Sequence, residues 1–180
     1  EERHYSPRIG KESFIIEAYL RIEKNSRDAI ILEKVNSSGY SISVDSNGKI
    51  NFKLLGKKSM YSLSTNAKIN DSEWHHILAE CDRKIKKINI YIDGKLDSCS
   101  EGPDNNISLA NSADIFVGGS PKGRCLNGTF DFLRISQGSL SDAKTTISEL
   151  YDWQFNGPFL RDFTGEKIDC EIRSAGAIQF

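Results

Sequence analysis

The sequence is poor in several features, and each scarcity excludes a class of protein. In its 180 residues no apolar run approaches the roughly 20 residues that a membrane-spanning helix needs. Neither sign of charge dominates, because 24 Lys and Arg stand against 25 Asp and Glu. A balanced charge argues against nucleic acid or an anionic membrane as the main partner. We therefore expect no nucleic-acid partner and no insertion into a membrane.

Cysteine is also scarce. The four cysteines, Cys81, Cys99, Cys125 and Cys170, form no Cys-x-x-Cys pair, so a structural zinc site is not expected. Cys81 shares the parity of the apolar residues before it, which predicts a buried free thiol. Cys99 and Cys125 lie in turn-rich segments and are the candidate disulfide in an exported protein. Cys170 has no assignment.

The overall composition is that of a folded globular domain. Hydrophobic residues make up 38% of the chain and charged residues 27%. A chain of this length buries roughly 70% of its unfolded surface, enough for a full core without a metal. We expect one domain over 1–180, with its core at about 12–155 and a turn-rich C-terminal tail, 156–180, packed on it.

Alternation of apolar and polar residues dominates the pattern. Residues 13–23 place five apolar side chains on one face and Glu17, Tyr19, Arg21 and Glu23 on the other, which predicts a half-buried strand. The same alternation recurs at 40–44, 50–54, 77–81 and 88–92, with turn residues such as 45–48 and 93–94 between strands. About ten short strands and no alternating β–α units predict an all-β fold.

A single segment has helical spacing. After Ser141 as a cap, residues Ile147, Leu150 and Tyr151 fall at i, i+3 and i+4, so a short helix is expected over 141–152. The predicted fold is therefore an antiparallel two-sheet β-sandwich, or jelly roll, with one short C-terminal helix.

Three segments in order carry a family resemblance. Trp74–Ile77, Tyr91–Leu96 and Asn127–Ile135, followed by Leu140-Ser141, are similar to the bacterial laminin G-like members of the concanavalin A-like jelly rolls. The resemblance implies a non-catalytic carbohydrate-binding, adhesive or architectural module of a larger exported bacterial protein. It also implies a secreted, periplasmic or cell-surface location, with the export signal outside this sequence, and a glycan or neighbouring domains as partners.

One position departs from the family pattern. The residue after Asp131 is usually polar in such domains, whereas here it is Phe132. Because Phe130 and Leu133 both have core character, we expect a β-bulge near Asp131 that turns Phe132 outward. There Phe132 would stack on a sugar, cover a neighbouring domain or pack under the expected helix.

The outward faces of two strands supply candidate sugar-binding residues. Asn89 and Tyr91 pair an amide with an aromatic ring, and Tyr19 lies on a comparable outward face. A ring stacks on the apolar face of a sugar while polar groups bind its hydroxyls. The candidate ligand-binding residues are thus Asn89, Tyr91, Tyr19 and Phe132.

Two alternatives remain open. Concanavalin A-like glycoside hydrolases use carboxylates on one strand, and Glu166, Asp169 and Glu171 are the acids that would fill this role. Glu166 differs in parity from the other two, which counts against a shared catalytic face. A protein–protein interaction module would instead present an apolar patch around Phe132 or Trp153.

Metal-binding and histidine chemistry have weaker support. No cofactor is expected. Asp45, Asn47 and Asp104 lie in oxygen-rich loops that could supply ligands to calcium. Asn and Asp are also ordinary turn residues, so these loops could equally be plain turns. His75 and His76 are adjacent and so point to opposite faces of a strand, which prevents joint chelation. We expect one to pack beside Trp74 and the other to face solvent.

Overall fold

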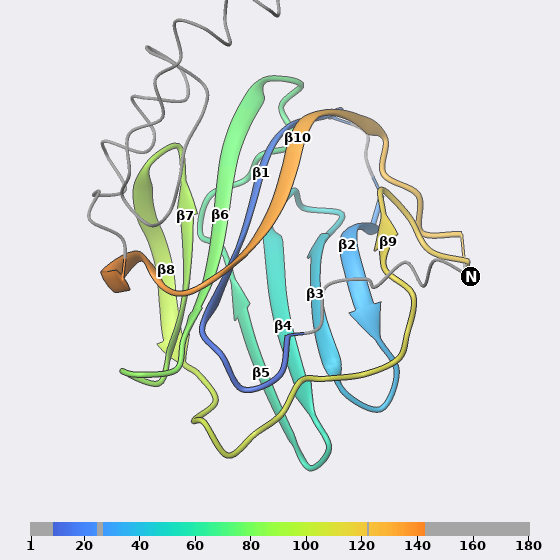
Figure 1. Cartoon of the computed structure of the whole chain (residues 1–180). Helices are drawn as coiled ribbons and strands as arrows, with labels where there is room; N and C mark the ends of the chain where they lie inside the picture. Colours follow the sequence, from blue (N-terminus) through green and yellow to red (C-terminus); the bar gives the residue numbers. More distant parts are fainter. Residues whose placement is uncertain (1–8, 25–26, 122, 143–180) are drawn as a thin grey trace, which may run out of the picture.

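The computed structural model describes residues 9–24, 27–121 and 123–142. Within them two five-stranded antiparallel sheets lie face to face (Figure 1). Sheet A has the order β10-β1-β6-β7-β8 and sheet B the order β5-β4-β3-β2-β9. The strands are β1 (Phe14–Ile22), β2 (Ala29–Val35), β3 (Gly39–Val44), β4 (Ile50–Gly56), β5 (Ser59–Ser64), β6 (Trp74–Asp82), β7 (Lys87–Ile92), β8 (Lys95–Glu101), β9 (Phe116–Val117) and β10 (Gly128–Gln137). The predicted jelly-roll sandwich is confirmed.

The core lies between the two sheets, on the face that alternation predicted for each strand. From β1 it receives Phe14, Ile16, Ala18, Leu20 and Ile22, each at most 3% exposed. Facing them from sheet B, Tyr40 and Phe52 place their ring centres 5.4 and 6.2 Å from that of Phe14. This aromatic cluster ties the sheets together by burying large apolar surfaces.

Tight turns set the register of the hairpins as expected. In the β3–β4 turn Gly48 has φ +82°, and in the β7–β8 turn Asp93 and Gly94 have φ +50° and +76°. Such left-handed residues match the twist of two antiparallel strands. The Asp93–Gly94 turn also places the Asp93 carboxylate at the start of β6, where it accepts a hydrogen bond from the His76 backbone N–H at 2.9 Å.

The predicted bulge at Asp131 is confirmed. Tyr19 pairs with Phe132 and Leu20 with Phe130, so Asp131 is the extra residue on β10. Phe130 and Leu133 both pack against the core because of this break in alternation. Without the bulge one of the two would point to the outer face.

Of the predicted C-terminal elements, little falls among the described residues. Leu140–Asp142 forms one turn of 3-10 helix, η1, where the helix was expected to begin. The remainder of the predicted helix and the tail 156–180 lie outside the described residues. Over the described ranges, no helix is long and apolar enough to cross a membrane.

The predicted bridge between Cys99 and Cys125 is wrong in this structure. Both thiols are free and exposed. Cys99 lies on β8, at one edge of sheet A, whereas Leu126, next to Cys125, bonds through its N–H to Gly118, beyond β9 at the edge of sheet B. Because β8 lies over β5, these two edges are on opposite sides of the sandwich. Cys81 is a buried free thiol, as predicted, and burial raises its pKa to about 12.

Candidate functional site

The outer face of sheet A carries an ionic cluster that alternation alone placed in solvent. Glu17, expected on the exposed side of β1, is 0% exposed. Its Oε1 lies 2.7 Å from Nε2 of the fully buried His76, and its Oε2 accepts a hydrogen bond from Nη2 of Arg134 at 2.5 Å. Of the two adjacent histidines, His76 is therefore the buried one.

This cluster fixes the charge of Glu17. Burial by itself raises the pKa of a carboxyl, because a charge is poorly solvated in the interior. The hydrogen bond with His76 and the positive charge of Arg134 outweigh burial here, and the pKa of Glu17 is lowered. The cluster thus crosslinks β10, β1 and β6 on the face opposite the core.

Beside this cluster an aromatic pair opens to solvent. The rings of Tyr19 and Trp74 stack with centres 5.0 Å apart and planes inclined by 30°. The guanidinium carbon of Arg21 lies 5.7 Å from the centre of the Trp74 ring, a distance at which a cation is attracted to the ring face. Trp74 remains 37% exposed. We call Tyr19, Arg21 and Trp74 the aromatic platform.

The strand register explains how the platform forms. Antiparallel pairing places Arg21 opposite Trp74 and Tyr19 opposite His76, so the three platform residues share one face of two neighbouring strands. Burial is the largest cause that raises the pKa of Tyr19, followed by the charges of Asp131 and Asp93. The Arg21 guanidinium thus lies over an exposed indole, and its Nε lies 3.5 Å from Oε1 of Glu23. Trp74 was missed as a site residue because only the pairing of β1 with β6 brings it to Tyr19.

The other predicted sugar-binding residues lie on the same face of sheet A, in other surroundings. Asn89 donates a hydrogen bond to Oε2 of Glu80 at 2.8 Å, which occupies its amide. Tyr91 is half-buried, and burial raises its pKa to about 12. Phe132 is half-buried with its ring centre 6.4 Å from that of His76. Of the four predicted residues, Tyr19 is the one that joins an exposed aromatic surface.

His75 sits in a clamp between two carboxylates. Its Nδ1 lies 2.8 Å from Oδ2 of Asp93 and its Nε2 lies 3.1 Å from Oδ1 of Asp71. The side chain is only 15% exposed, so the expectation that the second histidine faces solvent is wrong. The hydrogen bond to Asp93 is the largest cause that raises the pKa of His75, and the pKa values of Asp71 and Asp93 are lowered.

We expect this clamp to make stability depend on pH. Because the folded pKa of His75 is raised, its contribution is complete below the unfolded pKa of about 6.5 and is lost as pH rises through the folded pKa. The two aspartates act in the opposite sense and lose their contribution in acid, so the clamp is strongest between about pH 4.5 and 6.5.

Urea unfolding at about pH 6 and pH 8.5 tests this dependence. The difference in unfolding free energy between the wild type and His75→Gln should be larger at the lower pH, by on the order of 1 kcal/mol. An equal difference at both values of pH would contradict a charged clamp.

The candidate calcium residues act as turn-forming residues in this structure. Oδ1 of Asp45 accepts the N–H groups of Asn47 and Lys49 at 2.9 and 3.0 Å, and Oδ1 of Asp104 accepts that of Asn106 at 2.9 Å. In the part of the chain that is described, no three His, Cys, Asp or Glu side chains gather as a metal site would require. The predicted acids Glu166, Asp169 and Glu171, and Trp153, lie outside the described residues.

The outer face of sheet B carries a shallow hollow of about 230 Å³. Its apolar part is formed by Ile30, Val35, Leu55 and Met60. Nη2 of Arg124 lies 3.4 Å from Oε2 of Glu33 within it. Its walls carry no exposed aromatic ring comparable with the platform.

Comparisons with known proteins agree with this architecture. A family model described as the concanavalin A-like lectin/glucanases superfamily matches residues 4–145. No curated protein matches.

Three solved structures similar to this chain are a toxin binding domain, a pair of laminin domains and a neurotoxin. The binding domain of Paraclostridial Mosquitocidal Protein 1 has a TM-score of 0.64 and 20% identity, over 89% of this chain and 42% of that one. Domains LG4-5 of the mouse laminin alpha1 chain have a TM-score of 0.61 and 13% identity, over 76% of this chain and 38% of that one. A structure of botulinum neurotoxin type C has a TM-score of 0.56 and 18% identity, over 78% of this chain and 35% of that one.

This chain therefore spans less than half of each of these structures. At such identities the likeness shows the fold, a laminin G-like sandwich, and the family match covers most of the chain. The chain belongs to the concanavalin A-like lectin/glucanases superfamily.

Proposed function

We propose that this chain is a non-catalytic, extracellular module that binds a glycan on the aromatic platform. The exposed indole of Trp74, stacked on Tyr19 with Arg21 over it, carries the proposal. Sugar rings present an apolar C–H face that packs on an indole, and their hydroxyls need charged or polar partners at the edge. Here Arg21 and the Glu23 carboxylate beside it are those partners.

The stacked geometry suits binding because it is already in place. Tyr19 holds the indole from one side, so Trp74 loses little side-chain freedom when a ligand docks. Botulinum neurotoxin type C, one of the similar structures, is described as entering cells by interaction with two ganglioside molecules, and ganglioside head groups are glycans. That similarity supports a glycan as the ligand of this module.

The non-catalytic assignment is supported by the fact that the carboxylates near the platform already bind other side chains of the protein. Asp71 and Asp93 both hold His75, and Glu17 is buried between His76 and Arg134. Retaining hydrolysis instead needs two carboxyls about 5 to 5.5 Å apart that face the sugar. The module would thus bind a glycan as one part of a larger exported bacterial protein.

Replacing Trp74 with Ala should abolish the stacking surface. On a glycan array, and then by titration with each sugar that binds, we expect Trp74→Ala to weaken binding about tenfold or more, since an aromatic stack contributes on the order of 1 kcal/mol beyond its buried area. Leu96→Ala is the matched control, because Leu96 is 55% exposed on the same sheet. Trp74→Phe should retain part of the affinity.

Two results would overturn this function. Binding that Trp74→Ala leaves intact would move the site away from the platform, and silence across a broad array would favour a protein-binding or architectural role. Release of new reducing ends from a bound glycan during incubation would contradict the non-catalytic assignment.

A further inference from the structure

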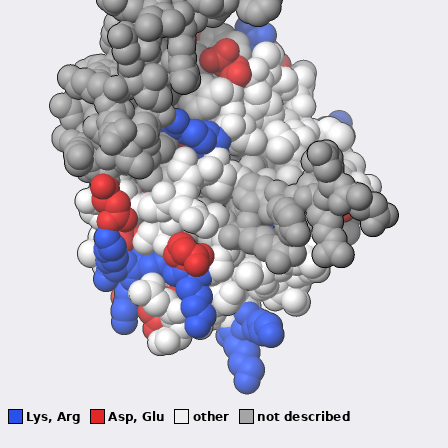
Figure 2. Space-filling view, viewed as in Figure 1, with Lys and Arg blue, Asp and Glu red and all other residues white. Residues whose placement is uncertain are grey.

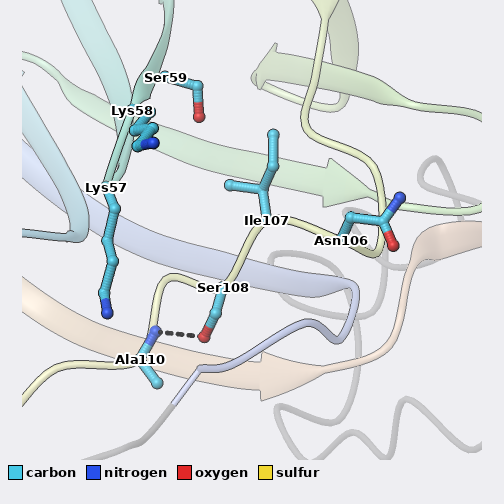
Figure 3. A pocket seen from close by; sticks show the side chains of 7 residues that line it. All are labelled: Lys57, Lys58, Ser59, Asn106, Ile107, Ser108 and Ala110. Carbon is cyan, nitrogen blue, oxygen red and sulfur yellow. Dashed lines mark hydrogen bonds between the residues drawn. The ribbon is translucent and has the colours of Figure 1, made fainter.

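A second hollow lies at the opposite end of the sandwich from the aromatic platform. It has a volume of about 500 Å³ and opens between the β4–β5 turn and residues 106–110 (Figure 3). Lys57 and Lys58 come from the turn and Ser59 from the start of β5, and the facing loop supplies Asn106, Ile107, Ser108 and Ala110. We call it the lysine hollow.

The lining of the lysine hollow favours an anionic ligand. Lys57 and Lys58 are both exposed, and within the described ranges neither forms an ion pair. Two hydroxyls and the Asn106 amide also line the hollow, and none of the lining residues is acidic. The side chain of Ile107 points from the loop toward the space between the two walls (Figure 3).

The buried Arg83 holds the loop wall in place. It is 3% exposed, and its Nη1 donates to the carbonyl oxygens of Asp104 and Ile107 at 2.6 and 2.8 Å. On the other side Gly56 packs so closely that a Cβ there would lie 2.6 Å from Cγ2 of Ile107. Both walls are therefore set before any ligand arrives, which lowers the entropic cost of binding.

The surrounding surface adds to the positive potential. Basic side chains, with a few acidic ones among them, gather over the lower end of the molecule, where the β4–β5 and β6–β7 turns lie (Figures 1 and 2). The β6–β7 turn supplies Lys84 and Lys86 next to Arg83, β7 begins with Lys87, and Lys84 pairs with Asp142. Gathering like charges around a hollow raises the local concentration of an oppositely charged ligand.

We propose that the lysine hollow binds an acidic saccharide through its sulfate or carboxylate group. The anion lies between the ammonium groups of Lys57 and Lys58, while hydroxyls and the Asn106 amide bond to the sugar and Ile107 contacts its apolar face. The recess, rather than a protruding apolar tip, favours a saccharide over a planar lipid surface. This site is independent of the proposed platform, at the other end of the fold.

Calorimetric titration of the full chain with a sulfated hexasaccharide, and with its desulfated counterpart, tests the proposal. We expect the sulfated sugar to bind and to weaken as salt is raised from about 50 to 500 mM, because exposed charges are screened. The Lys57→Ala/Lys58→Ala double variant should lose about tenfold or more in affinity, since it removes two charge-assisted contacts. The control Lys95→Ala removes an exposed lysine of the β7–β8 turn and should bind as the wild type does.

Further measurements distinguish the lysine hollow from the aromatic platform and an acidic saccharide from a lipid surface. In Trp74→Ala the part of the sulfated-sugar binding that Lys57→Ala/Lys58→Ala removes should persist, and any binding of uncharged glycans to the platform should fall, so failure of the platform and failure of the lysine hollow give different results. Sulfated and carboxylated hexasaccharides that do not bind, or that bind the double variant as tightly, would overturn the proposal. Binding that depends on Lys57 and Lys58 but is seen with phosphatidylserine vesicles and with neither sugar would also overturn it.

Discussion

Replacing Glu17 with Ala should destabilise the fold by about 3 kcal/mol, because the change removes the buried carboxylate to which the buried His76 and the half-buried Arg134 both bond. Glu17 is 0% exposed and joins His76 to Arg134 across three strands. Urea unfolding followed by circular dichroism measures the loss. Since all three strands carry or flank the aromatic platform, partial loosening would also reduce glycan binding.

An exposed pair of the same chemistry provides the control for this prediction. Glu33 lies 3.4 Å from Arg124 at the surface, and Glu33→Ala should cost less than about 1 kcal/mol. The Glu17→Gln variant keeps the shape and loses the charge. Because the folded pKa of Glu17 is lowered, the contribution of its charge is present above the unfolded pKa of about 4.3 and is lost as pH falls through the folded pKa. If Glu17→Ala matched Glu33→Ala, the ionic cluster would not be a stabilising crosslink.

Phe14→Ala should have an effect of similar size for a different reason. Phe14 is 0% exposed and contacts Tyr40 and Phe52 of the facing sheet. Removing its ring leaves a cavity where the two sheets meet, which costs about 3 to 5 kcal/mol. Thermal unfolding should show a fall in Tm of well over 5 °C for a domain of this size.

Exposed Met60 gives the matched comparison for Phe14. It is 67% exposed on β5, and Met60→Ala should change the unfolding free energy by no more than about 0.5 kcal/mol. Phe14→Leu should fall between the two, because a smaller volume is lost. A Phe14→Ala variant as stable as Met60→Ala would mean that the sheets are not held together by this cluster.

Much of the fold could be predicted from residues that are close in sequence. Alternation in β1 identified the buried set, turn residues placed Gly48 and Gly94, and the two core-type residues around Asp131 required the bulge that the structure contains. These are local properties, because the side-chain period of a strand and the φ of a turn depend on a few consecutive residues.

The candidate sites depended on strand pairing, which no local pattern specifies. Trp74 reaches Tyr19 only because β6 lies beside β1, and Glu17 lies 59 residues from His76 and 117 from Arg134 in sequence. The same strand order separates Cys99 from Cys125 to opposite edges and closes the lysine hollow against residues 106–110. The sequence by itself thus determined which side of each strand enters the core. Only the tertiary structure decided which outward side chains meet, because burial of a charge or stacking of a ring needs a partner that a distant strand supplies.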